Sequence, residues 1–205
     1  MGDFVAILAG GVGVIGGAVW LLLTERRWER DGHEPVPALG IKPTSALAWR
    51  WGSLAVSCIS AGACALAAPR LSCAAAILAY IAALDWRYRL IDPAMIISCG
   101  GLAALLAPSP LATIAVEAAV GASSYLLAWF AGRGGARFGL GDTFLLAAIA
   151  GMVGPYRAGT FLLSAIAELL IVLVRMKSKK EDTMAPLAPL MLAPCIVSIA
   201  LGGSL

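Results

Sequence analysis

Long apolar stretches separated by short polar and basic ones dominate this 205-residue sequence. With 60% hydrophobic and 13% charged residues, the chain is far more apolar than a soluble domain, which is about 45–50% apolar and about 25% charged. A domain of this size cannot bury so much apolar surface in water. The apolar residues also run on without the alternation of barrel strands, so an all-α bundle of membrane-spanning helices is predicted.

Eight apolar segments can be marked, compared with the about 17 to 25 residues that a membrane span needs. They cover residues 4–23, 46–68, 71–84, 91–107, 111–131, 140–153, 158–174 and 184–201. The third and the sixth are short and each adjoins an aspartate, as expected of a helix that meets a polar cavity before it clears the lipid. One transmembrane domain over residues 1–205 is predicted, with a polar cytosolic loop at 24–45 and a charged cytosolic hinge at 177–183.

Lysine and arginine are unequally divided between the stretches that connect these segments. If the N-terminus lies outside and each segment crosses once, 13 of the 15 basic residues fall on the inner side and 2 on the outer side. Cytoplasmic loops of membrane proteins carry such an excess, and a wrong number of segments would destroy the alternation. About eight transmembrane helices, N-out and C-out, are therefore predicted.

Four acidic residues lie within or at the rim of apolar segments, where an ionisable group is costly and suggests a functional site. Asp85 ends the third segment and Asp142 begins the sixth, so both are expected at the inner face at similar depth. Glu117 and Glu168 lie inside the fifth and seventh segments. For these two, a structural pairing is at least as well supported as a catalytic role.

Two carboxyl groups at one depth suggest acid–base chemistry. Within hydrogen-bonding distance they cannot both ionise, so the pair shares one proton. The ionised member can then take a proton from water while the protonated member polarises a scissile carbonyl. Gly139 and Gly141 precede Asp142 and, lacking Cβ atoms, allow an extended substrate to approach the backbone. Close packing between helices at these glycines is an equally supported interpretation.

No metal or cofactor site is predicted. The five cysteines all lie in apolar segments without a CxxC spacing, and they are interpreted as small buried thiols. The only histidine, His33, lies in a polar loop without a ligand-type partner, and we expect it to be solvated. The net charge of +3 does not indicate a nucleic-acid partner.

Two motifs resemble those of the type IV prepilin peptidases, a family of membrane aspartyl proteases. Residues 84–95, LDWRYRLIDPAM, are similar to the first aspartate motif, in which an Asp ends a helix, a basic residue follows and Ile-Pro precedes the next helix. Residues 139–154, GLGDTFLLAAIAGMVG, resemble the second motif, GxGD followed by an apolar helix. The last apolar segment resembles the family's Pro-rich closing helix, so the likeness covers most of the chain.

This resemblance implies a multi-pass aspartic endopeptidase of the bacterial inner membrane, with Asp85 and Asp142 as catalytic residues. Its substrates would be prepilins or pseudopilins, whose short basic leader is removed at the cytoplasmic face. Supporting roles, in substrate binding or in structure, are implied for Gly139, Gly141, Arg87, Pro93 and Arg137. The oligomeric state is left open.

The sequence departs from the family pattern at three places. Phe144 stands where the family usually has Lys, two positions after the GxGD aspartate, and Arg137 is a candidate replacement for the missing charge. Asp92 intervenes between Ile91 and Pro93. The loop at 24–45 lacks the zinc-binding Cys pairs of larger members, so we expect peptidase activity without N-methyltransferase activity.

Acidic residues of the inner loops are candidates to meet the positive charges of the leader, with a simple solvated loop as the alternative. They are Glu25, Glu29, Asp31, Glu34 and Asp92. Two other functions stay open. A secondary transporter would use Glu117 and Glu168, although the chain shows no internal repeat. A non-catalytic membrane component of a pilus or secretion assembly would fit the missing Lys.

Overall fold

The computed structural model describes residues 2–36, 44–106 and 187–202, together with positions 112, 115, 116, 119, 123, 144, 145, 148 and 149. Its elements are α1 (Gly2–Arg30), α2 (Ala46–Ala67), the short 3-10 helix η1 (Pro69–Leu71), α3 (Ser72–Tyr88), α4 (Pro93–Leu106) and α8 (Leu187–Gly202). All regular structure in these residues is helical, which confirms the all-α part of the predicted fold class. The segment predicted at 158–174 and the hinge at 177–183 lie outside the described residues.

Two described helices are long and apolar enough to cross a membrane, over Ile7–Arg30 and Ala46–Ala67. Shorter apolar stretches occupy Pro93–Leu102 in α4 and Ala188–Val197 in α8. The predicted number of eight spanning helices and the N-out orientation therefore remain predictions.

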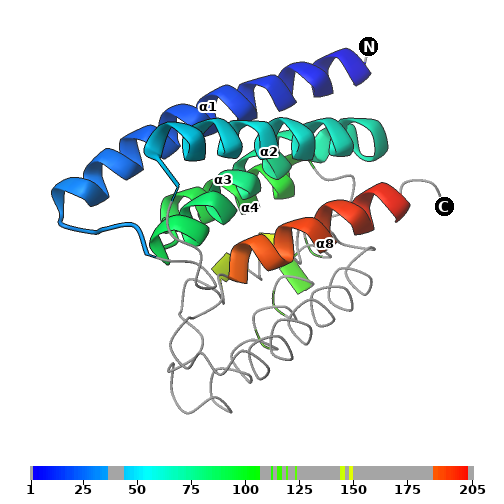
Figure 1. The fold of residues 1–205 in the computed structure, drawn as a ribbon. Helices are drawn as coiled ribbons and strands as arrows, with labels where there is room; N and C mark the ends of the chain where they lie inside the picture. Colours follow the sequence, from blue (N-terminus) through cyan, green and yellow to red (C-terminus); the bar gives the residue numbers. More distant parts are fainter. Residues whose placement is uncertain are drawn as a thin grey trace, which may run out of the picture.

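Helix α3 is the central element of the described bundle. It contacts α1, α2, α4 and α8, and Figure 1 shows α1 on one side of it and α8 on the other. Of its 17 residues, 15 are buried. A helix covered by protein on all sides does not have to match the thickness of lipid, which accounts for the shortness of the third apolar segment.

Glycines allow α1 to lie directly against α3. A Cβ atom on Gly13 would come within 2.9 Å of both Cα and the carbonyl oxygen of Cys73. At Gly17 the ring of Tyr80 occupies the space that a Cβ would need. The hydroxyl of Tyr80 donates a 3.0 Å hydrogen bond to the carbonyl of Val14. Small residues at a seam and polar contacts across it are typical of helices that associate in lipid.

Helix α2 exposes large apolar side chains and buries mainly small ones, which is the reverse of a helix at the surface of a soluble protein. Its buried residues are Trp49, Ser53, Ser57, Ser60, Ala61 and Cys64. Its exposed large apolar residues are Leu47, Trp51, Val56, Ile59 and Leu66. Ser57 donates a 3.1 Å hydrogen bond to the carbonyl of Ala76 in α3. A buried face that, apart from Trp49, consists of small residues, three of them serines, behind an apolar outer face suits a helix surrounded by lipid.

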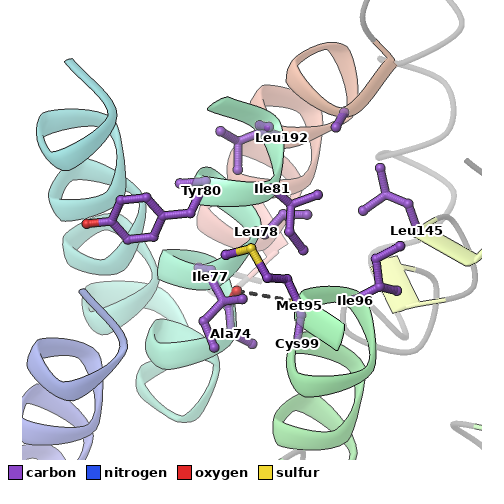
Figure 2. Packing of buried hydrophobic residues seen from close by; sticks show 14 of the residues in the cluster. Ala74, Ile77, Leu78, Tyr80, Ile81, Met95, Ile96, Cys99, Leu145 and Leu192 are labelled. Atoms are coloured by element: carbon purple, nitrogen blue, oxygen red, sulfur yellow. Dashed lines mark hydrogen bonds between the residues drawn. The ribbon is translucent and has the colours of Figure 1, made fainter. Parts of the chain in front are cut away.

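On the side of α3 away from Tyr80, a hydrophobic cluster joins α3 to α4 and to the segment that contains Leu145. Figure 2 shows Met95 and Ile96 of α4 near Ile81 of α3, with Leu145 facing them, while Tyr80 points the opposite way. Leu145 and Ile149 are only 0% and 1% exposed. The segment that follows Asp142 in sequence therefore contributes to the same core as α3.

The prediction of buried thiols is confirmed for four cysteines, Cys64, Cys73, Cys99 and Cys195. Cys99 donates its Sγ hydrogen to the carbonyl of Ala74, at 3.4 Å (Figure 2). The prediction is wrong for Cys58, which lies on the exposed face of α2.

The polar loop predicted at residues 24–45 begins later than expected, because α1 continues to Arg30. Hydropathy falls at Thr24, but Thr24 and Trp28 remain on the buried face while Arg26 is exposed. Gly32, two residues after the last residue of the helix, has a φ of 83°. The amide of Gly32 bonds to the carbonyl of Glu29 at 3.2 Å, and that of His33 to Trp28 at 2.9 Å. This is the Schellman arrangement that glycine permits, and His33 is exposed after it, as predicted.

Candidate active site

Asp85 lies in the last turn of α3 and is 6% exposed. Its Oδ2 atom accepts a buried 2.9 Å hydrogen bond from the backbone amide of Ala188, in the first turn of α8. Amides of a first helical turn have no acceptor within their own helix, and they carry the positive end of the helix dipole. The start of α8 therefore fixes the direction of the Asp85 carboxyl group.

The sequence of α8 is compatible with a first helical turn at this point. Pro189 follows Ala188 directly. Proline is tolerated in a first turn because it has no N–H to leave unbonded there. The amide of Ala188 finds its acceptor in the carboxylate of Asp85.

The backbone of Asp85 is also hydrogen-bonded. Its carbonyl accepts a 3.1 Å hydrogen bond from the amide of Arg89, which closes the end of α3. Arg89 has a φ of 58°, in the left-handed region that favours glycine. That conformation costs a non-glycine residue roughly 1–2 kcal/mol. Arg89, four residues after Asp85, therefore has a strained backbone conformation at the point where the helix ends.

Arg87, for which the sequence implied a supporting role, is turned into the protein. Its side chain is 7% exposed, and its guanidinium lies 4.8 Å above the ring of Trp49. Its NH1 donates a 3.1 Å hydrogen bond to the carbonyl of Thr44, and its Nε lies 3.8 Å from Oε1 of Glu25. Of the two roles left open, this arrangement supports structure over substrate binding.

Pro93, the other described supporting residue, is the first residue of α4. Asp92 caps this helix, because its Oδ1 accepts a 3.0 Å hydrogen bond from the amide of Ala94. Asp followed by Pro is a strong signal for a helix start. Pro93 therefore supports the structure of the turn between α3 and α4.

Asp92 also binds α1 through its second carboxylate oxygen. Oδ2 accepts hydrogen bonds from Arg27 NH2 at 3.2 Å, Thr24 Oγ1 at 3.2 Å and Trp20 Nε1 at 3.4 Å. With 4% exposure, Asp92 is not an acid of a solvated loop. The prediction that it is available to a positively charged leader is therefore wrong.

The same prediction is wrong for Glu25, which lies inside α1 and is 0% exposed. Its carboxylate pairs with Arg50 and Arg87 instead. The other three acids proposed for this contact, Glu29, Asp31 and Glu34, are exposed.

The remaining predicted site residues lie outside the described residues. They are Asp142, Gly139, Gly141 and Arg137, and the intramembrane acids Glu117 and Glu168. Phe144, in the place of the family's Lys, is described and is 61% exposed. Within the described part of the chain, no three His, Cys, Asp or Glu side chains converge to hold a metal ion.

A bundle of apolar helices with an apolar outer face, two of them long enough to cross a membrane, is compatible with a membrane-embedded helical protein. A family model described as the type IV leader peptidase family matches residues 72–174, just over half of the chain. The chain belongs to this family, whose members are membrane-embedded peptidases that act on prepilin-type substrates. No curated protein and no solved structure matches the chain.

The matched residues include both predicted catalytic aspartates, together with α3 and α4. They leave out α1, α2 and α8. Ala188, which the sequence did not indicate as a partner of Asp85, lies in the unmatched part.

Proposed function

We propose that this chain is a membrane-embedded aspartic endopeptidase that removes the short basic leader from prepilins or pseudopilins, using Asp85 and Asp142. The observation that carries the proposal is the setting of Asp85. This carboxyl group is almost completely buried, it is held by an amide of α8, and it lies in the family-matched segment that also contains Asp142.

The hydrogen bond from Ala188 supports a division of roles between the two aspartates. An amide donor at a helix N-terminus stabilises a carboxylate more than a neutral carboxyl group. We therefore assign Asp85 as the ionised member and Asp142 as the member that carries the shared proton. Such a pair titrates as a unit, so the assignment describes the state that starts the cycle.

The chemical steps follow from these roles. Asp85 takes a proton from a water molecule while the oxygen of that water bonds to the scissile carbonyl carbon. At the same time Asp142 donates a hydrogen bond to the carbonyl oxygen. The bond from that carbon to nitrogen then breaks, and the proton held by Asp85 passes to the leaving amine. The products are a carboxylate on the leader and a free amino terminus on the pilin.

The proposed location is the bacterial inner membrane, with eight spans, both termini outside and the site at the cytoplasmic side. The apolar outer faces of α1 and α2 support membrane insertion, and the 13-to-2 division of basic residues supports the orientation. Peptidase activity without N-methylation is proposed, because the loop between α1 and α2 has no cysteine.

Cleavage of a prepilin by the purified enzyme in proteoliposomes tests the proposal. Asp85→Asn and Asp142→Asn should each abolish leader removal on a gel while leaving membrane insertion unchanged, because Asn has nearly the same shape but cannot exchange a proton. Undiminished cleavage by either variant would exclude the aspartyl mechanism. A wild-type protein that never cleaves prepilins would favour the transporter or the non-catalytic assembly component.

A further inference from the structure

The carboxylate of Glu25 is fully enclosed although it lies in the most charged stretch of α1. Burial of an unpaired carboxylate is strongly unfavourable, so it requires partners. Oε2 accepts a 2.8 Å hydrogen bond from Arg50 Nε, and Oε1 accepts one of 3.2 Å from the hydroxyl of Tyr88. Arg87 Nε lies 3.8 Å from the same Oε1 atom. The family assignment does not explain this group.

Two of the three partners belong to the last turn of α3. Arg87 and Tyr88 follow Asp85 by two and three positions in the same helix. The ring of Tyr88 meets Trp28 edge-on at a centroid distance of 5.5 Å, and Trp49 at 6.2 Å. The Tyr88 ring is therefore fixed between a side chain of α1 and one of α2.

The last turn of α3 is consequently held from two directions. Glu25 ties it to α1 and, through Arg50, to α2. The Asp85 carboxyl group ties it to α8. A rotation of this turn, or a shift along the helix axis, would have to break the hydrogen bond from Tyr88 to Glu25 and the ion pair of Arg87 with Glu25, as well as the bond to Ala188.

We propose that Glu25 is a positioning residue of the aspartyl site. Its carboxylate sets the rotation and depth of the last turn of α3 through Tyr88 and Arg87, and thereby the placement of Asp85. Reaction rates depend steeply on such placement, since a displacement of about 1 Å can cost about 100-fold. The inference rests on the proposed function. It also means that the matched residues 72–174 need α1 and α2, which lie outside the match, to hold the site.

Glu25→Gln tests the inference, with Arg26→Gln as the matched control. Arg26 is the next residue of the same helix and is exposed. We expect kcat for prepilin cleavage in proteoliposomes to fall about 10- to 100-fold in Glu25→Gln while KM stays within about threefold, because the change misplaces a catalytic group and leaves substrate binding intact. Arg26→Gln should keep wild-type values for both constants.

Tyr88→Phe and Glu25→Asp make the test independent of any single variant. Tyr88→Phe removes one hydrogen bond to Glu25 and should lower kcat less than Glu25→Gln does. The double variant Glu25→Gln/Tyr88→Phe should lose less than the product of the single losses, because the two residues act through one contact. Glu25→Asp keeps the charge and should recover part of kcat.

Each kcat is calculated per amount of folded enzyme, and the folded amount is measured by thermal unfolding in detergent. The positioning role would be overturned if folded Glu25→Gln had the wild-type kcat, so that its lower activity came only from a smaller amount of folded protein. Fully multiplicative losses in the double variant would also overturn it. Failure of the proposed function is distinguishable, because it appears as no cleavage by the wild type or as cleavage by Asp85→Asn, before any change at Glu25.

Discussion

Asp85 and Ala188 are 103 positions apart in the sequence, and a buried 2.9 Å hydrogen bond joins the carboxylate of one to the backbone amide of the other. The contact lies where the last turn of α3 meets the first turn of α8. It depends on the main chain of residue 188 and not on its side chain. Removal of the amide hydrogen is therefore the direct way to test it.

Ala188→Pro should lower prepilin cleavage about 10- to 100-fold, because it removes a hydrogen bond to a charged group, which contributes about 1.5–3 kcal/mol. Proline is compatible with the first turn of a helix. Ala188→Gly keeps the N–H and serves as the control. The rates are compared in proteoliposomes at equal amounts of folded enzyme. Equal activity of the two variants would show that the amide does not contribute to catalysis.

Gly13→Ala should destabilise the protein by about 1–3 kcal/mol, the usual cost of overpacking. The added Cβ meets main-chain atoms of Cys73 at 2.9 Å, so no side-chain rotation can relieve the contact. Gly11→Ala is the matched control, since a Cβ there has no neighbour within 4 Å. Unfolding in detergent, followed by circular dichroism, should separate the two variants. A Gly13→Ala protein as stable as Gly11→Ala would contradict the close approach of α1 to α3.

Two substitutions at Asp92 should separate its cap from its contact with α1. Asp92→Asn keeps an oxygen that can cap α4 but loses the charge that pairs with Arg27 at 3.2 Å. Asp92→Ala loses both functions, and a lost cap alone costs about 1 kcal/mol. Thermal stability in detergent should fall in the order wild type, Asn, Ala. If the Asn and Ala variants melt together, the cap to α4 contributes nothing measurable.

The proposed orientation can be tested after the end of α1 and before the start of α3. Asp31 and Arg70 are both exposed, Asp31 just after α1 and Arg70 in η1, at the start of α3. With the exposed Cys58 replaced by Ser, we expect Asp31→Cys to react with a membrane-impermeant maleimide from the cytoplasmic side. Arg70→Cys should react from the outside. Labelling of Asp31→Cys from the outside would exclude the N-out topology, and labelling of both positions from one side would exclude a crossing by α2.

The helical class of the fold could be predicted because apolar runs of this length admit few alternatives. The end of α1 could not be found from hydropathy, which falls at Thr24. The signal that was available is the spacing of Leu21, Thr24, Glu25 and Trp28, which puts all four on one face of a helix, and all four are buried. An acid on that face was a candidate for burial with a partner.

The site was predictable in part. Asp85 stood out because an acid at the rim of an apolar segment is rare, and the structure places it in the last turn of α3 as expected. Asp92 was predicted to meet the leader's charges, with a solvated loop as the alternative, although Asp before Pro at the start of a helix indicates a cap. The amide of Ala188 could not have been identified, since contacts between segments 103 positions apart depend on packing and leave no local pattern.

The enclosure of α3 also sets an order of events during synthesis. Its neighbours α1 and α2 precede it and can insert first, whereas α8 leaves the ribosome about a hundred residues after Asp85. Until α8 has docked, Asp85 lacks the amide that orients it. On the proposed function, a nascent chain holds an unfinished site until α8 has been synthesised, and cleavage begins only once α8 has packed beside α3.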